Sequence, residues 1–166
     1  MGNTDKLVND ILSVLEQDAR TTPAQIAAMT GATEDAVREQ IKTLEENGVI
    51  RRYKTVINWE KVGKELIYAF IDVKVSPMRG VGFDAVAERI YRYPEVTSVY
   101  LVSGEYDLRV VVTGSTMQEI AYFVSEKLST IDRVHATASH FVLKRYKVDS
   151  DIFEEPTEDK RLAVAP

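Results

Sequence analysis

The stretch TTPAQIAAMTGATEDAVREQIKTLEENGVI, residues 21–50, predicts two short helices joined by a tight turn. Thr22 followed by Pro23 is typical of a helix start, because a threonine side chain caps free N–H groups and proline suits the first helical turn. Thr33 offers the same capping chemistry before the second helix. Gly48 is placed to end that helix, since glycine accepts the left-handed conformation that follows many helix C-termini.

A further helix is predicted before this stretch, beginning at a Thr4 cap, because apolar residues recur there at spacings of three and four. Two short helices joined by a turn at Gly31 have the spacing of a helix-turn-helix motif. Met29 is expected to turn inward on the middle helix. Residues 49–57 alternate loosely and predict a strand or a small wing. Residues 1–57 are therefore predicted to form a three-helix, winged helix-turn-helix DNA-binding domain.

A reading helix must be anchored by one apolar stripe while its opposite face enters the major groove of double-stranded DNA. Arg38 and Lys42 lie one turn apart on that outer face and can meet a base edge and a phosphate. The segment's dense basic cluster follows this helix, at residues 51–54. The candidate DNA-contacting residues are Arg20, Thr22, Thr33, Asp35, Arg38, Glu39, Lys42, Arg51, Arg52 and Lys54.

The charge balance of this segment leaves two interpretations open. Residues 1–60 carry 7 basic and 10 acidic side chains. Carboxylates such as Glu39 repel phosphate, although one of them can accept a hydrogen bond from cytosine. The same pattern fits a DNA reader with few, well-placed cations and a plain helical bundle that binds no DNA.

The hydrophobic pattern changes after residues 58–65, which predict a hinge. Residues 66–150 then alternate strand and helix patterns in the order βαββαβ, which is the ferredoxin-like arrangement. The whole chain is therefore predicted to be of the α+β class. The strands are predicted over residues 66–76, 97–103, 107–113 and 134–146.

The two helices of this module are expected to cover one face of its sheet. Tyr91 belongs to the inward stripe predicted for the first helix, and Met117 to that of the second. A capping box of Ser115 and Gln118 is predicted to start the second helix. The core face of the first strand is predicted to carry Ile67, Ala69, Ile71, Val73 and Val75.

The opposite face of that strand would carry the aromatic residues Tyr68 and Phe70. Exposed aromatic side chains on an antiparallel sheet invite a partner, although scattered surface aromatics are also ordinary. The pattern predicts a homodimer with a two-fold, sheet-to-sheet contact that buries Tyr68 or Phe70.

The turn Ser103-Gly104-Glu105-Tyr106-Asp107 is a candidate binding site for a small zwitterion. A turn led by glycine leaves backbone N–H groups free for a carboxylate, and Asp107 could take an ammonium group. An ordinary hairpin turn would have the same sequence. The candidate effector-binding residues are Ser103, Gly104, Tyr106 and Asp107, with Thr137 and Ser139 on the last strand as weaker candidates.

The composition excludes several function classes. The chain has 166 residues, a formal net charge of −5 and no cysteine, which excludes disulfides, zinc fingers and thiol nucleophiles. His135 and His140 are expected on opposite faces of one strand, so no metal site is predicted, and no cofactor is expected. No signal peptide or membrane span is recognised, which predicts a cytoplasmic protein. Residues 151–166 predict a disordered, acidic tail.

Taken together and in order, these motifs resemble the Lrp/AsnC (feast/famine) family of transcription regulators. The resemblance extends from about Thr4 to Tyr146 and is carried by Asp18-Ala19-Arg20, Leu44-Glu45-Glu46-Asn47-Gly48-Val49-Ile50, Gly63 and residues 103–107. It implies a DNA-binding helix-turn-helix and a module that senses small effectors, usually amino acids. It also implies dimers that assemble into octamers or larger rings, with the effector bound near residues 103–107.

Two alternative functions stay open beside that of an effector-responsive transcription regulator. The acidic excess of residues 1–60 would suit a ligand-binding oligomeric protein that has lost DNA binding. A sirohaem-decarboxylase-like enzyme would share the two-part fold. The two histidines and the lack of an evident cationic pocket argue against that enzyme, and no catalytic residue is predicted.

Overall fold

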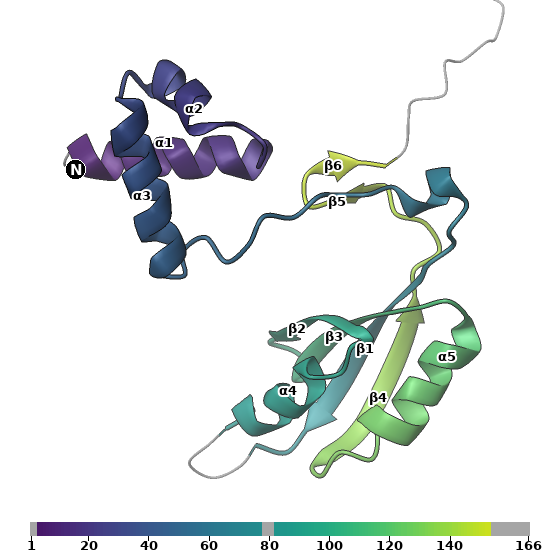
Figure 1. Ribbon diagram of the computed structural model, residues 1–166. Coiled ribbons are helices and arrows are strands. Elements are labelled where there is room, and N and C mark those ends of the chain that lie inside the picture. Colours follow the sequence, from purple (N-terminus) through teal and green to yellow (C-terminus); the bar gives the residue numbers. More distant parts are fainter. Residues whose placement is uncertain (1–2, 78–81, 154–166) are drawn as a thin grey trace, which may run out of the picture. The chain divides into compact units, whose positions relative to one another are not determined.

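The computed structural model describes residues 3–77 and 82–153 (Figure 1). The chain divides into two compact units, residues 1–57 and 58–166, and each has its own hydrophobic core. Residues 1–2, 78–81 and 154–166 lie outside the described residues, and the last range is most of the predicted tail.

The first unit is the predicted set of three helices. Its core is formed by apolar residues that recur every three or four positions, so each helix buries one stripe. The helices are α1 (Asn3–Gln17), α2 (Pro23–Thr30) and α3 (Glu34–Glu46). The buried residues are Ile11, Ile26, Ala27, Val37 and Leu44.

The helix termini of this unit follow the predicted capping chemistry. Thr22 and Gln25 form a reciprocal capping box at the start of α2. The Thr33 hydroxyl accepts a hydrogen bond from the backbone of α3. Gly48 has a φ of +68°, as a glycine that ends a helix requires.

Three expectations for the first unit are wrong. Helix α1 begins at Asn3, so Thr4 lies inside its first turn instead of capping it. Met29 is exposed on α2, because Ile26 and Ala27 fill the core position that it was expected to share. No strand forms over residues 49–57 in the structure, because no described segment pairs with them; the chain is irregular there.

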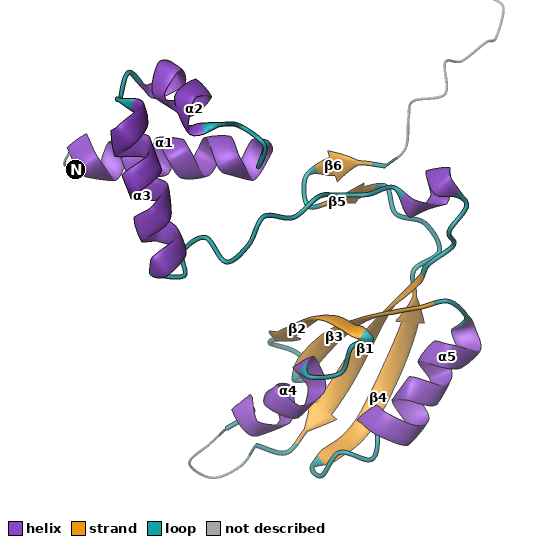
Figure 2. Cartoon of the chain, in the orientation of Figure 1, coloured by secondary structure: helices purple, strands orange, loops and turns teal. Residues whose placement is uncertain are grey.

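The second unit opens with a short helix in the predicted hinge and then forms the predicted βαββαβ module. A four-stranded antiparallel sheet in the order β2-β3-β1-β4 is covered on one face by two helices (Figure 2). The elements are η1 (Trp59–Val62), β1 (Ile67–Val75), α4 (Asp84–Tyr91), β2 (Val96–Leu101), β3 (Leu108–Gly114), α5 (Met117–Tyr122), a π-helical continuation η2 (Phe123–Leu128) and β4 (Val134–Phe141).

Alternation along the strands determines which face is buried. On β1 the predicted residues from Ala69 to Val75 are buried toward the helices, and Ile67 packs at the edge of that core. The central strand β3 contributes alternate residues in the same way. The largest fully buried side chains of this unit are Phe123, Ile71, Ile90, Leu108, Ile120 and Leu128.

Several details of the module differ from expectation. Tyr91 and Met117 are exposed. The cap of α5 is Thr116, whose hydroxyl accepts from Glu119, while the Ser115 N–H donates to the Glu119 carboxylate. The cap is thus one residue later than the predicted one.

The C-terminal part of the module also differs. Strand β4 ends at Phe141, five residues before the predicted end at Tyr146. Beyond it, β5 (Lys147–Val148) and β6 (Asp151–Ile152) form a small antiparallel hairpin. Residues 151 and 152 therefore form a strand where the disordered tail was expected to begin.

Candidate DNA-contacting face and ligand pocket

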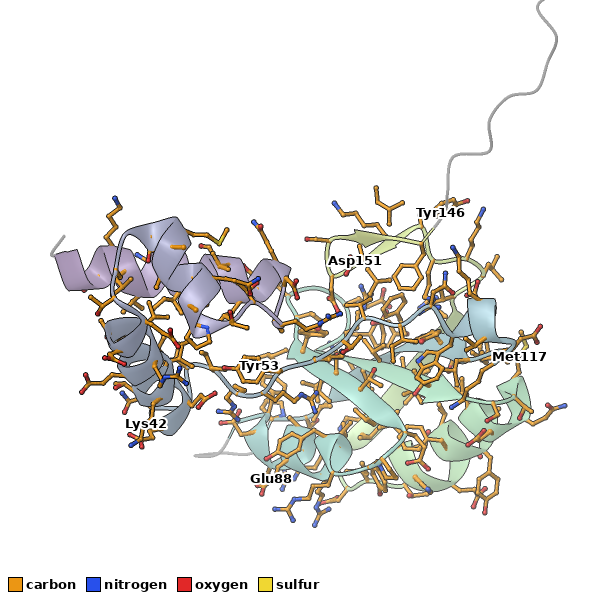
Figure 3. All side chains as sticks on the ribbon, turned by 45° about the horizontal axis from the view of Figure 1, so that its top comes forward. Lys42, Tyr53, Glu88, Met117, Tyr146 and Asp151 are labelled. Carbon is orange, nitrogen blue, oxygen red and sulfur yellow. The ribbon has the colours of Figure 1, made fainter. Side chains whose placement is uncertain are left out.

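The outer face of α3 carries the two cations that the sequence assigned to DNA. Both side chains are exposed, and Lys42 projects from the helix (Figure 3). Arg38 forms an ion pair with Glu34, and the Lys42 ammonium lies 3.8 Å from the Glu46 carboxylate. Exposed pairs of this spacing contribute at most about 1 kcal/mol each, so a DNA phosphate can compete for either cation.

The threonines assigned to this face have structural partners. Thr22 accepts from the Gln25 N–H at 3.3 Å and donates to the Gln25 side chain at 2.9 Å. Thr33 accepts at 3.3 Å from the Ala36 N–H. Both hydroxyls stabilise helix starts, while Arg20, Asp35 and Glu39 are exposed.

The basic cluster after α3 differs from the helix in its partners. Arg51, Arg52 and Lys54 are exposed and form no ion pair with any residue that the structure describes. Between them, the Tyr53 hydroxyl donates to the Glu45 carboxylate at 2.8 Å. Partial burial and this bond raise the pKa of Tyr53. The cluster is thus joined to the end of α3 by one hydrogen bond, and its three cations are free to bind phosphate.

A pocket of about 760 Å³ lies on the face of the sheet that the helices leave open. The turn between β2 and β3 forms one wall of it, and this wall includes the predicted residues Ser103, Gly104 and Tyr106. Gly104 has a φ of +142°, a conformation open to glycine and strained for other residues. The other lining residues are Asp72, Leu101, Val102, Glu105, Arg109 and His140.

The floor of this pocket holds an ion pair between neighbouring strands. Asp72 on β1 lies opposite Arg109 on β3. The guanidinium donates to both carboxylate oxygens, with distances of 2.7 and 2.9 Å. These bonds hold the pKa of Asp72 below its ordinary value. The Asp72 side chain is only 9% exposed, and His140 Nε2 lies 3.5 Å from its carboxylate.

Asp107 lies beside this pocket without lining it. Its carboxylate accepts from the Val75 N–H at 2.9 Å and lies 3.5 Å from the Lys74 ammonium. Its own N–H donates to the Val73 carbonyl. In this geometry Asp107 attaches the turn to β1.

Thr137 and Ser139 lie on the other side of the sheet from the pocket. They pair in register with Val73 and Ile71, whose side chains face the helices. Directly opposite residues in a sheet point to the same face. The structure therefore does not bring these two hydroxyls together with the turn of residues 103–107.

Six lining residues were not among the predicted effector-binding residues, and three of them, Asp72, Arg109 and His140, come from the strands of the open face. The signal that could have found them is strand alternation. Arg109 stands between the buried residues Leu108 and Val110. It must therefore share the open face with Asp72, which alternates with the core residues of β1 in the same way.

The two aromatic residues predicted at a dimer contact lie on this open face of β1. Phe70 is exposed. Tyr68 is half-buried, because the Arg145 guanidinium lies 4.2 Å from its ring centre. Arg145 also lies over the Phe153 ring at 4.7 Å and pairs with Glu60 of η1 at 3.1 Å.

Residues 3–77 and 82–153 contain neither a metal-binding cluster nor a membrane-spanning helix. No group of three or more His, Asp or Glu side chains in these ranges is arranged to hold a metal ion. None of the helices there combines the length and the apolar character that a bilayer span needs.

Comparison with known proteins assigns both units to described domains. Residues 4–51 match a winged helix-turn-helix DNA-binding domain, and residues 68–152 match the Lrp/AsnC ligand binding domain. The HTH-type transcriptional regulator YugG of Bacillus subtilis is 51% identical over 95% of both chains. The HTH-type transcriptional regulator FL11 of Pyrococcus furiosus is 30% identical, covering 91% of this chain and 97% of its own.

Solved structures give the same result. A transcriptional regulator from Neisseria meningitidis, in complex with L-methionine, is 26% identical with a TM-score of 0.68, covering 86% of this chain and 92% of that one. The feast or famine regulatory protein from M. tuberculosis, also complexed with L-methionine, is 26% identical with a TM-score of 0.73, covering 89% and 97%. The fold, the two matched domains and these relatives show that the chain belongs to the Lrp/AsnC family of effector-responsive, DNA-binding transcriptional regulators.

Proposed function

We propose that the open-face pocket is the effector site of this regulator and that its effector is a small α-amino acid. The observation that carries the proposal is the convergence of the 103–106 turn with the Asp72–Arg109 pair around one hollow. A zwitterion needs a cation and an anion a few ångströms apart, and this pocket offers both charges. Two structural neighbours were solved with L-methionine, an amino acid of this kind.

Arg109 is the proposed partner of the effector carboxylate. A guanidinium has five N–H donors, and two of them bond to Asp72. The remaining donors can bind a second carboxylate in the bidentate geometry that makes such bonds strong. Half of the Arg109 side chain is exposed, which leaves those donors accessible.

Glu105 is the proposed partner of the effector ammonium. Its exposed carboxylate lines the pocket and has no partner among the described residues. Asp107, which the sequence favoured for this role, acts instead as a positioning residue, because the backbone and Lys74 engage its carboxylate. Ser103, Gly104 and Tyr106 complete the wall.

Calorimetry with the twenty amino acids tests this site. Glu105→Gln should weaken the binding of the best amino acid by about tenfold or more, because a charge-assisted hydrogen bond is lost. Glu65→Gln removes an exposed carboxylate before β1 and serves as the matched control. Equal binding by wild type and Glu105→Gln, or no binding of any amino acid in the millimolar range, would refute the assignment.

We further propose that α3 reads base edges while the cluster at residues 51–54 binds phosphates. A homodimer with about three phosphate-binding cations per subunit should give a slope near −5 for log affinity against log salt. Arg38→Ala should relax sequence preference, whereas Arg51→Ala should weaken all sequences alike and, because it removes one cation from each subunit, reduce the slope by about 2. Failure to bind DNA upstream of the protein's own gene at low salt would favour a ligand-binding assembly protein.

Assembly is part of the same proposal. We propose a homodimer, or a larger assembly of dimers, in which the open sheet face with Tyr68 and Phe70 is covered by a second copy. An effector bound on that face would bias how copies assemble, and thereby how the protein binds DNA. Light scattering that shows a monomer at micromolar concentration would contradict this proposal without affecting the amino-acid site.

A further inference from the structure

A second hollow, of about 470 Å³, lies on the helix-covered side of the second unit, where α4 and η2 end. It shares no residue with the open-face pocket. Of the residues that line it, three are cations and none is an anion. The lining residues are Arg89, Arg92, Tyr93, Lys127, Thr130 and Ile131.

The three cations of this hollow are not equally neutralised. Arg92 forms an exposed ion pair with Glu88, one turn back on α4. Lys127 pairs with Glu95 at 2.5 Å. Arg89 forms no ion pair with any residue that the structure describes. The hollow and its immediate partners therefore carry one excess positive charge, at Arg89.

Lys127 is held in place from several sides. Its ammonium lies 5.7 Å from the centre of the Tyr93 ring and 6.0 Å from that of Phe123. The bond to Glu95 raises the pKa of Lys127, so this side chain stays charged. Glu95 does not line the hollow, and one oxygen of its carboxylate is buried with no hydrogen-bond partner among the described residues.

The backbone that carries Lys127 has an uncommon form. Residues 123–128 continue α5 as a π-helix, a conformation found for well under about 1% of residues and often located at functional sites. The Thr130 hydroxyl donates to two carbonyls of this wide turn. It is thus occupied, and recognition in the hollow is left to guanidinium and ammonium donors.

We propose that this hollow is a binding site for a small phosphate-bearing anion, held by Arg89, Arg92 and Lys127. Guanidinium groups match phosphate oxygens in a planar, bidentate geometry, and lysine adds a point charge. The volume lies in the range of small-molecule pockets, about 300–1,000 Å³. The site is separate from the proposed amino-acid site, so it would give the regulator a second, chemically different input.

The same three cations could instead stabilise their own helix or bind DNA. Cations near a helix C-terminus stabilise the helix without any ligand, and Arg89 lies in the last turn of α4. Basic side chains can also contact the DNA backbone. The geometry favours a small ligand over DNA because these cations line a hollow and one of them, Lys127, has a side chain only 38% exposed.

Calorimetry of the full chain with inorganic pyrophosphate, and with inorganic phosphate, tests the proposal at constant ionic strength. Wild type should bind pyrophosphate more tightly than phosphate. Arg89→Ala should weaken pyrophosphate binding by about tenfold or more, and Arg89→Lys by less, because a lysine keeps the charge and loses the bidentate geometry. Lys147→Ala, which removes one charge from the distant strand β5, should leave the affinity unchanged.

Three results would overturn the proposal. Equal weakening by Arg89→Ala and Lys147→Ala would show a general charge effect. If wild type does not bind pyrophosphate in the millimolar range, the role of Arg89 is to stabilise the C-terminus of α4. If Arg89→Ala instead weakens DNA binding while pyrophosphate does not bind, the hollow is a DNA contact. Amino-acid binding by the same variants reports separately on the open-face pocket.

Discussion

The two units differ in how their charged side chains are partnered. On α3, Arg38 and Lys42 pair with glutamates one turn away, and all four side chains are largely exposed. In the second unit, the Asp72 and Glu95 carboxylates are mostly buried, and each bonds to a cation from another element. An exposed pair exchanges its partner at little cost, whereas removing one member of a buried pair leaves a charge stranded. The DNA-contacting unit thus keeps its cations available, and the ligand-binding unit uses its charges to fix strands and helices together.

The largest effect is expected when the Asp72 carboxylate is left without its partner Arg109. Arg109→Ala should lower the free energy of unfolding of the second unit at pH 7, because the mostly buried Asp72 carboxylate loses its bidentate partner. Denaturant unfolding monitored by circular dichroism measures this loss. Asp72→Asn/Arg109→Gln is the control, because it replaces the ion pair with a neutral pair and should recover part of the stability.

The stability lost through Arg109→Ala should depend on pH. Arg109 holds the pKa of Asp72 low, so the pair stabilises the fold above the ordinary aspartate value of about 3.9 and this contribution is lost as pH falls through the folded pKa. The difference between wild type and Arg109→Ala should therefore shrink as pH falls toward 4 and below. A difference that stays constant between pH 7 and pH 3 would show that the pair's charge is unimportant.

A smaller effect is expected at Asp107, which distinguishes a structural from a ligand-binding carboxylate. Asp107→Ala should cost about 1–2 kcal/mol, since the Val75 N–H loses its acceptor. Asp107→Asn retains an acceptor oxygen and should cost less. If the stable Asp107→Asn variant still binds amino acids, the positioning role stands; loss of binding at unchanged stability would restore the direct ammonium contact that the sequence suggested.

The smallest effect is expected on α3. Arg38→Ala and Lys42→Ala should each change the free energy of unfolding by less than about 0.5 kcal/mol, because exposed pairs one turn apart contribute little. Thermal melts in low and high salt provide the measurement. A loss larger than about 1 kcal/mol at either position would show that α3 depends on its surface charges and would erase the contrast between the units.

The sequence was sufficient where one period or one capping residue determines the structure. Alternation identified the buried face of β1 from Ala69 to Val75, and the caps at Thr22 and Thr33 placed two helix starts. The sequence was insufficient at the start of α5, because Ser115 and Thr116 can both cap a helix. The structure shows that Thr116 caps it, while the Ser115 N–H donates to the Glu119 carboxylate.

The other wrong predictions concern which segments have a neighbouring strand to pair with. Residues 49–57 have strand-like composition, yet a strand requires a neighbour, and no described segment supplies one. The β5–β6 hairpin was missed for the opposite reason. Asp149 and Ser150 both take positive φ in its two-residue turn, a conformation that usually signals asparagine and glycine. Strand alternation places Arg109 on the open face of the sheet. Only the register of β1 and β3 shows that Asp72 lies directly opposite it.

Arg145 has a consequence for the reach of the DNA-reading helix. Its side chain is only 13% exposed, and its guanidinium stacks on Tyr68 and Phe153 and pairs with Glu60, so η1 is fastened to the sheet. Ile50 packs against the core of the first unit, and Asn58 caps η1. The tether between these two residues spans at most about 28 Å when fully extended, and Tyr53 within it bonds to Glu45 at the end of α3. In the proposed homodimer, a tether this short would keep the second α3 at a millimolar effective concentration for DNA bound by the first. It would also set an upper limit on how far apart two operator half-sites can lie and still be occupied together.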